Sequence, residues 1–363
     1  MTKFRYLVYN PCVDSVDVAK DWGNNIFDTT QDIAVALTQP FTIAAVSVMF
    51  DQPHVFNYNP TIKDIDLTKF DLVLLSDIEY SKQKDIEFWA RQRGIKNYLI
   101  ALGGINSHTQ LDPTCMLYRP YWIHRYLEKN TLANTYADNK PFMFDCLLGA
   151  RRPHRDYIML ALTKSGLIDS SIVTYRDVFP GAIVDAQSAI IANLFPKTPL
   201  NWPYVSPNLD STWEVADTIN NQVSFDSPNA IFAQTHYSII AETLGTGNDF
   251  FLSEKTIKAM YASRVFVVFG PRHYLKRLHE LGFQTFGHVI DESYDDEPVD
   301  SVRYQKAMLQ VMRLAWFEDP KNIYSLCDFV FINNLRVLPY LHQNAQEEMY
   351  RLLRAHTPAK CWL

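Results

Sequence analysis

Residues 248–270 read NDFFLSEKTIKAMYASRVFVVFG, a helix pattern that runs into a strand pattern. Ser253 belongs to the residue types favoured at helix N-caps, and Ile257, Met260 and Tyr261 recur at the spacing of one apolar helix face. The run RVFVVFG next to it has the length and composition of a buried strand. The stretch therefore predicts an α/β fold.

The same alternation extends along the chain in both directions. Strand patterns occur at 4–10, 41–50, 70–77, 96–104, 142–150 and 170–176, and helix patterns at 33–38, 84–94, 151–167, 273–282, 299–317 and 344–356. Regular structure also resumes at 229–243 after the irregular segment. Apolar strands separated by helices indicate mainly parallel sheets covered on both faces.

A polar, Asn-rich segment at 128–141 separates two such alternations. We expect an N-terminal domain at 1–140, a C-terminal α/β domain at 141–340 and a closing helical segment at 341–363 that packs back on the first domain. Residues 177–226 lack periodicity and predict an irregular insertion. Two α/β domains in tandem predict a ligand cleft between the carboxyl ends of two sheets.

Composition narrows the class of protein. The 363 residues are 47% hydrophobic and carry a net charge of -6, so the chain has no global attraction for nucleic acid. The five cysteines form no CxxC pair, which argues against disulfides and a zinc site. The first residues do not form a signal peptide, and no apolar run reaches the length of about 18 residues that a membrane span needs. We expect a cytoplasmic protein.

Cations cluster at two predicted helix starts. Lys255 and Lys258 lie in the first turns of one helix, and Arg151, Arg152, His154 and Arg155 surround the start of another. A helix N-terminus already carries about half a positive charge, so each such cation costs about 0.3–1 kcal/mol in the free protein. A bound phosphate would reverse the sign of that interaction. The alternative is that these cations are solvated or paired with Asp156, Asp177 or Glu242.

The residues of three motifs resemble a known family. The segments RRPHRDYIMLALTKSGLID, HYSIIAET and FFLSEKTIKAMYASRVFVVFGPRHYLKRLHELGFQTFGHVIDESYDD resemble glycosyltransferase-like proteins of bacteriophages and large viruses. They are distantly similar to the nucleotide-binding half of the fucosyltransferase family. The likeness covers roughly residues 145–300, and the N-terminal domain carries no comparable resemblance.

The resemblance implies a GT-B fold, in which two Rossmann-like domains face each other and the C-terminal domain holds a nucleotide-sugar donor. It implies that Glu254 contacts the ribose, that Lys255 contacts the diphosphate and that Arg152 or Arg155 neutralises phosphate charge. Glu242 would line the same pocket, and Ser253 stands where the fucosyltransferase pattern usually has Thr.

These residues together predict transfer of a sugar from a nucleoside diphosphate without a required metal, because fixed cations can stabilise the leaving diphosphate. Carboxylates at Asp64 and Asp66 and at 295–297 could instead hold Mg²⁺ or Mn²⁺, although their positions are typical of exposed loop acids. A nucleotide-binding module without catalysis and a sugar epimerase are the competing classes.

An inverting transfer needs a base from the N-terminal domain. Asp77 follows the most clearly buried strand and is the first candidate, and Asp14 is the second; helix capping is the competing role. Asp21, Glu79 and His108 follow other strands. Gly103 and Gly104 predict a tight turn, because the spacing of a dinucleotide-binding motif is absent.

Two kinds of acceptor are compatible with the sequence. Residues 116–129, MLYRPYWIHRYLEK, interleave aromatic and basic side chains that could stack on bases or sugars; an amphipathic helix packed between domains is the alternative. The phage resemblance suggests hydroxymethylated pyrimidines in DNA as one acceptor, reached by base flipping. A glycan or protein hydroxyl is the other.

Overall fold

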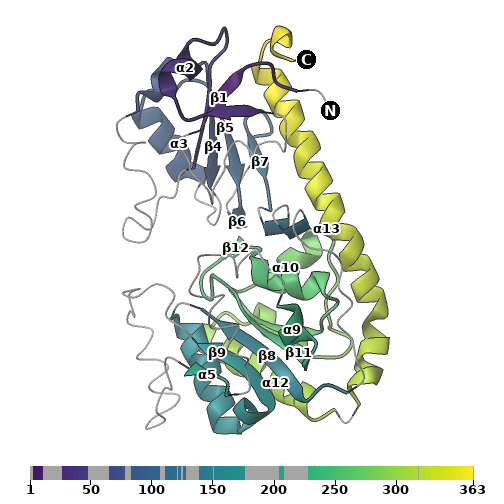
Figure 1. The fold of residues 1–363 in the computed structure, drawn as a ribbon. Coiled ribbons are helices and arrows are strands. Elements are labelled where there is room, and N and C mark those ends of the chain that lie inside the picture. Colours follow the sequence, from purple (N-terminus) through teal and green to yellow (C-terminus); the bar gives the residue numbers. More distant parts are fainter. Residues whose placement is uncertain are drawn as a thin grey trace. The chain divides into compact units, whose positions relative to one another are not determined.

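The computed structural model describes residues 3–10, 27–47, 65–77, 83–106, 111–120, 122–123, 126–127, 139–149, 151–175, 204–207, 228–317 and 319–362. The chain divides into two compact units. Unit 1 comprises Met1–Tyr121, Asp249–Phe251 and Tyr340–Leu363, and unit 2 comprises Trp122–Asn248 and Leu252–Pro339. Each is a mixed α/β structure with a parallel sheet, as the alternation of patterns predicts (Figure 1).

Within the described residues, unit 1 is built on a parallel six-stranded sheet in the order β2-β1-β3-β4-β5-β7. Its strands are β1 (Leu7–Tyr9), β2 (Asp28–Thr30), β3 (Ile43–Ser47), β4 (Leu72–Asp77), β5 (Tyr98–Leu102) and β7 (Met116–Tyr118). The helices are α2 (Ile33–Leu37), α3 (Gln83–Gln92) and the short η2 (Leu67–Lys69). An antiparallel ribbon joins β6 (Gly104–Asn106) to β12 (Asp249–Phe251).

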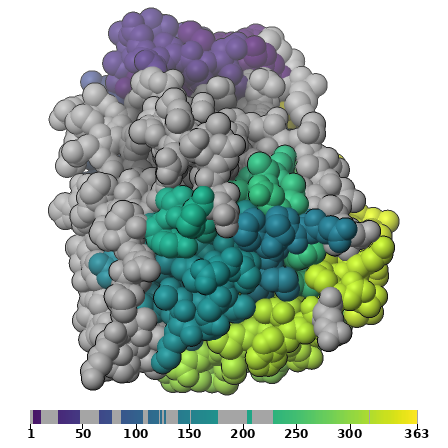
Figure 2. Space-filling model, turned by 60° about the horizontal axis from the view of Figure 1, so that its bottom comes forward, coloured from purple at the N-terminus to yellow at the C-terminus, as the bar shows by residue number. Residues whose placement is uncertain are grey.

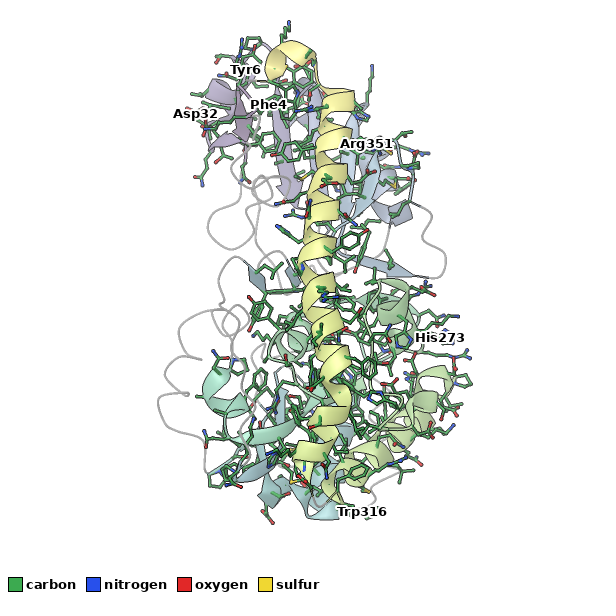
Figure 3. The ribbon with its side chains drawn as sticks, turned by 90° about the vertical axis from the view of Figure 1, so that its right-hand side faces the viewer. Phe4, Tyr6, Asp32, His273, Trp316 and Arg351 are labelled. Atoms are coloured by element: carbon green, nitrogen blue, oxygen red, sulfur yellow. The ribbon has the colours of Figure 1, made fainter. Side chains whose placement is uncertain are left out.

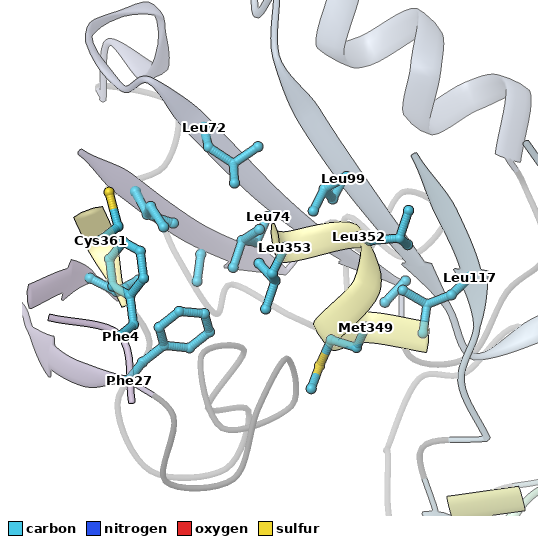
Figure 4. Packing of buried hydrophobic residues seen from close by; sticks show 14 residues of the cluster. Phe4, Phe27, Leu72, Leu74, Leu99, Leu117, Met349, Leu352, Leu353 and Cys361 are labelled. Carbon is cyan, nitrogen blue, oxygen red and sulfur yellow. The ribbon is translucent and has the colours of Figure 1, made fainter. Parts of the chain in front are cut away.

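The two faces of this sheet form separate cores. Alternate residues of β4 show the division: Val73 and Leu75 pack with α3, whereas Leu72 and Leu74 pack with the last turns of the C-terminal helix. That second core contains Met349, Leu352, Leu353, Phe4 and Cys361, as Figure 4 shows. The closing residues of the chain therefore complete the hydrophobic core of unit 1.

Unit 2 has a five-stranded sheet among its described residues, in the order β10-β9-β8-β11-β13. Its strands are β8 (Phe142–Leu148), β9 (Ser171–Tyr175), β10 (Tyr204–Val205), β11 (Thr235–Ala241) and β13 (Phe266–Phe269), and all pairs are parallel except β9 with β10. Every residue of β9, β11 and β13 is buried. Such burial explains why these strands form continuous apolar runs in the sequence.

Helices cover both faces of the unit 2 sheet. They are α5 (Pro153–Ser165), α9 (Asn229–Phe232), α10 (Glu254–Tyr261), α11 (Tyr274–Glu280), α12 (Asp300–Ala315) and the first part of α13 (Pro320–His356), with short turns at η3 (Leu167–Ser170) and η4 (Glu292–Asp296). Tyr157 of α5, Tyr304 of α12 and Phe269 of β13 stack together on one face. Figure 2 shows α5 and α12 side by side on this face, in teal and yellow-green.

A buried ion pair ties the interior of this sheet. Arg264, fully buried just before β13, donates to Asp145 of β8 at 2.5 Å. The same guanidinium donates to the backbone carbonyl oxygens of Thr235 and Phe232. Arg264, just before β13, is therefore hydrogen-bonded to β8 and to the start of β11 through one planar cation.

Sequence-predicted helix ends agree closely with the structure. Pro153 occupies the first position of α5, and Gly166 ends it in the left-handed conformation at φ 75°. The closing helix, however, is much longer than the predicted 344–356, because α13 spans 37 residues and contains Pro339. In the region predicted as an irregular insertion, the structure describes residues 204–207, which include β10; the rest of 177–226 lies outside the described residues.

The end of α13 offers a direct test of how unit 1 is stabilised. Leu352 has no exposed surface and lies in the core beneath β4 and β5, so Leu352→Ala is expected to lower the free energy of unfolding by about 2–5 kcal/mol. Chemical denaturation followed by circular dichroism measures this change. The exposed Glu347→Ala on the same helix is the control, and equal effects of both variants would contradict the assignment.

Candidate functional site

The site lies where the strand order of unit 2 reverses. From β8 the chain crosses through α5 to β9 on one side, whereas β11 lies on the other side of β8 and leads through α10 to β13. Open α/β sheets bind ligands in the crevice at the carboxyl ends of the two strands at such a reversal. Arg151 and Arg152 come after β8, and Glu242 and Thr243 come after β11, so the predicted residues meet at this position.

One buried residue, Glu242, joins the starts of α5 and α10 through its side chain and its backbone carbonyl. Glu242 is buried, and its side chain accepts hydrogen bonds from the Thr256 hydroxyl in the first turn of α10 and from the backbone N–H of Thr243. Its backbone carbonyl lies 2.8 Å from Nε2 of His154 in the first turn of α5. The Tyr274 hydroxyl completes the shell at 2.8 Å. The two N-termini are therefore held beside the same residue.

The start of α10 agrees with the sequence prediction. Ser253 is the N-cap and accepts the backbone N–H of Lys255 at 3.2 Å, so its hydroxyl is used within the helix. The Lys255 ammonium lies 2.5 Å from the Glu254 carboxylate and 3.5 Å from the Thr243 hydroxyl. Burial alone would raise the pKa of Glu254, but Lys255 and Lys258 outweigh it and lower the pKa. Glu254 is therefore ionised at neutral pH.

The cations at the start of α5 divide into two groups. Arg151 donates through Nε to both carboxylate oxygens of Asp156, at 3.1 and 3.2 Å, and Tyr175 also donates to Asp156. Arg151 is therefore paired with Asp156, which is the alternative to phosphate binding that the sequence left open. Arg152, the N-cap residue, makes no side-chain capping bond, and its buried Nε has no hydrogen-bond partner among the described residues.

Arg155 adds a buried positive charge beside Arg152. Burial, and then repulsion from Arg152, lowers the pKa of Arg155 to about 10, so this guanidinium remains protonated at neutral pH. Its Nη2 contacts the carbonyl oxygen of Glu242 at 3.4 Å. Two guanidinium groups therefore lie close together at the start of α5, and a bound anion would offset their repulsion.

His154 does not belong to this group of cations, contrary to the sequence prediction. Burial and repulsion from Arg155 hold the pKa of His154 well below its ordinary value, so the ring is neutral. Its contact with the Glu242 carbonyl requires Nε2 to carry the proton, because a carbonyl oxygen can only accept. His154 therefore acts as a neutral donor that fixes the loop after β11.

That loop is also held from α12, a contribution that the sequence did not reveal. The buried Arg303 donates to the carbonyl oxygens of Gly245 at 3.1 Å and Gly270 at 3.2 Å, and the Tyr304 hydroxyl donates to Gly245 at 2.6 Å. A Cβ at Gly245 would lie 2.1 Å from Nδ1 of His154, so only glycine fits there. The regular i, i+3 pattern of α12 gives no signal for this role.

The acids considered as metal ligands are used otherwise. Asp295 is buried rather than exposed, and its carboxylate accepts the backbone N–H groups of Leu275 and Lys276 at the start of α11, at 3.0 Å each. Asp66 caps η2, and Asp64 lies outside the described residues. Within the described part of the chain no group of three or more metal-ligating side chains occurs.

The candidate catalytic bases lie in segments of unit 1 whose side chains are outside the described structure. Asp77 is the last residue of β4, in register with Leu102 of β5, but only its backbone is described. Asp14 lies outside the described residues, as do the lesser candidates Asp21, Glu79 and His108. Of the aromatic segment 116–129, the first three residues form β7, so the alternative of one continuous helix is wrong there.

Comparisons with known proteins add no assignment. Neither a scan against protein-family models nor a search of curated proteins finds a match for the chain. No described helix combines the length and apolar character needed to cross a membrane.

Glu292, in the same segment as Asp295, gives this part of the unit a pH dependence. It accepts from the Thr285 hydroxyl at 2.6 Å and the Phe286 N–H at 2.8 Å, and burial raises its pKa from 4.5 to about 7. The folded state therefore binds an extra proton between these pH values, and the free energy of unfolding falls as the pH rises from about 4.5 to 7.

We expect Glu292→Gln to remove the fall in the free energy of unfolding between pH 4.5 and 7, because the amide mimics the protonated carboxyl and does not titrate. Denaturation at pH 5 and pH 8 measures the difference, with the exposed Glu347→Gln as the control. A variant that keeps the full pH dependence of the wild type would contradict the role of Glu292.

Proposed function

We propose that unit 2 binds the diphosphate of a nucleotide sugar and that the protein is a glycosyltransferase. The observation that carries the proposal is the meeting of two helix N-termini, those of α5 and α10, at the strand-order reversal, with Arg152 and Lys255 beside them. Backbone N–H groups and the helix dipole favour phosphate at such an end. Arginine adds bidentate hydrogen bonds, and lysine adds a compact charge.

The proposed chemistry depends on where charge develops. When the bond between the sugar and the β-phosphate oxygen breaks, the leaving diphosphate gains negative charge. Arg152, Arg155 and Lys255 would stabilise that charge. The helices that carry these cations are already held next to each other by hydrogen bonds to Glu242. Such an arrangement lowers the barrier, because the cations are in place before the reaction. The proposal does not require a metal ion.

The presence of unit 1 is compatible with a two-domain transferase. Unit 1 has its own parallel sheet, and the proposal of a GT-B enzyme assigns the acceptor to it. Asp77 at the end of β4, or Asp14 after β1, would take the proton from the acceptor hydroxyl. In this proposal Glu254, held ionised by Lys255 and Lys258, would accept a hydrogen bond from a ribose hydroxyl.

The proposed acceptor is a hydroxymethyl group on a pyrimidine of DNA. This part of the proposal rests on the resemblance to glycosyltransferase-like proteins of bacteriophages. A glycan or protein hydroxyl is the alternative acceptor, and a nucleotide-binding module without turnover is the alternative class. All three alternatives use the same proposed nucleotide site at the starts of α5 and α10. They differ in the step that follows nucleotide binding.

Nucleotide affinity tests the crevice first. Lys255→Ala and Arg152→Ala are each expected to weaken binding of UDP or GDP at least tenfold, or about 1.4 kcal/mol, because each removes a phosphate contact. Isothermal titration calorimetry measures the affinity. Arg151→Ala is the matched control, since Arg151 is engaged with Asp156 and should alter stability while keeping most of the affinity. Unchanged binding in the first two variants would remove those residues from the site.

Turnover separates the proposed classes. The wild-type protein is incubated with UDP- and GDP-sugars and with hydroxymethylated duplex DNA, plain duplex DNA or a panel of glycans, and the release of nucleoside diphosphate is measured. Release that depends on hydroxymethylated DNA is the expected result, and release that depends on a glycan assigns the other acceptor. Binding without any release would contradict a glycosyltransferase, and a changed nucleotide sugar formed without acceptor would indicate an epimerase.

A further inference from the structure

The three-residue strand β12 belongs to unit 1, although the residues on both sides of it belong to unit 2. It pairs antiparallel with β6, and Phe250 lies directly opposite Ile105 (Figure 1). Phe250 and Phe251 are almost completely buried, at 1% and 2% exposure. The chain therefore leaves unit 2 for one short, buried strand and then returns to it.

Both ends of β12 are attached to the proposed nucleotide site. Shortly before the strand, the carbonyl oxygen of Gly245 accepts hydrogen bonds from Arg303 and Tyr304. After the strand, the fully buried Leu252 is the single residue before Ser253, which caps α10 by accepting the backbone N–H of Lys255 at 3.2 Å. A displacement of β12 therefore moves the first turn of α10, because no flexible linker separates the strand from the helix.

The partner strand β6 is attached in the same way to the carboxyl edge of the sheet in unit 1. Gly103 is the single residue between the end of β5 at Leu102 and the start of β6. Leu102 lies in register with Asp77, the first candidate for the catalytic base. Through the chain, the β6–β12 ribbon is therefore linked to the carboxyl end of β5 on one side and to the start of α10 on the other.

We propose that the β6–β12 ribbon couples nucleotide binding at α10 to unit 1, a regulation that rests on the proposed function of α10. A phosphate held at the first turn restrains Ser253 and, through Leu252, keeps β12 paired with β6. By linkage, loss of this pairing weakens nucleotide binding by the same factor, which is typically about fivefold or more. Nucleotide binding would thus order the strand that follows β5 before an acceptor binds.

Hydrogen exchange of the full chain tests the effect of the nucleotide on the ribbon. UDP or GDP, whichever isothermal titration calorimetry shows to bind, should slow exchange of the amides of 104–106 by about fivefold or more. In Lys255→Ala, the same slowing should require about tenfold more nucleotide, because occupancy of the site causes it. Failure of both nucleotides to bind overturns the proposed function and the coupling with it. Binding without slower exchange in 104–106 overturns the coupling alone.

A change in β6 tests the effect of the ribbon on the nucleotide. Ile105→Pro distorts the pairing from the side of unit 1 and should weaken nucleotide binding by the same factor as the nucleotide slows exchange. Circular dichroism checks the fold, and Ile105→Gly replaces Ile105→Pro if the proline variant is unfolded.

A second strand of unit 1 supplies the matched control. Thr29→Pro places proline in β2, another three-residue edge strand, whose last residue Thr30 accepts the backbone N–H of Asp32, labelled in Figure 3. This variant should keep the affinity of the wild type. An affinity that the change at Ile105 leaves unaltered, or that both changes lower equally, overturns the proposal.

Discussion

Burial of the Glu242 carboxylate constrains the rest of the candidate site. A carboxyl group is costly to bury without hydrogen-bond partners, so its oxygens need donors from the surrounding elements. The donors come from α10, from α11 and from the loop itself, and the backbone carbonyl of the same residue accepts a hydrogen bond from His154 in α5. Two helices far apart in sequence are thereby fixed with their N-terminal ends beside each other.

The cations near this junction are costly in the free protein. Arg152 and Arg155 lie at a helix N-terminus that is itself positive, and burial, followed by repulsion from Arg152, lowers the pKa of Arg155. Asp156, the acid available in the same turn, is already engaged by Arg151 and Tyr175. These unfavourable charges lie where α/β sheets usually bind ligands. A bound anion would neutralise them, which is consistent with an anion-binding site.

The loops around the proposed diphosphate site are held in position by residues that would not contact the ligand. Arg303 and Tyr304 of α12 hold Gly245 against His154, and Asp295 caps α11 from a segment with several acids. Asp295 resembles a metal ligand in the sequence because Asp serves both roles. Its backbone partners show the capping role here, and such partners cannot be read from residue spacing.

The sequence by itself determined the α/β class, most strands, both ends of α5 and the start of α10. Those features depend on local signals: apolar runs, Pro153 at a helix start, Gly166 at a helix end and Ser253 at an N-cap. It also indicated where cations gather. Only the tertiary structure decided which of them are engaged within the protein, that His154 is neutral, and that the closing segment belongs to one helix of 37 residues, α13. The reason is that pairing, burial and proton binding depend on neighbours that the sheet brings together. The order of the strands in the sheet cannot be predicted from any single segment of the sequence.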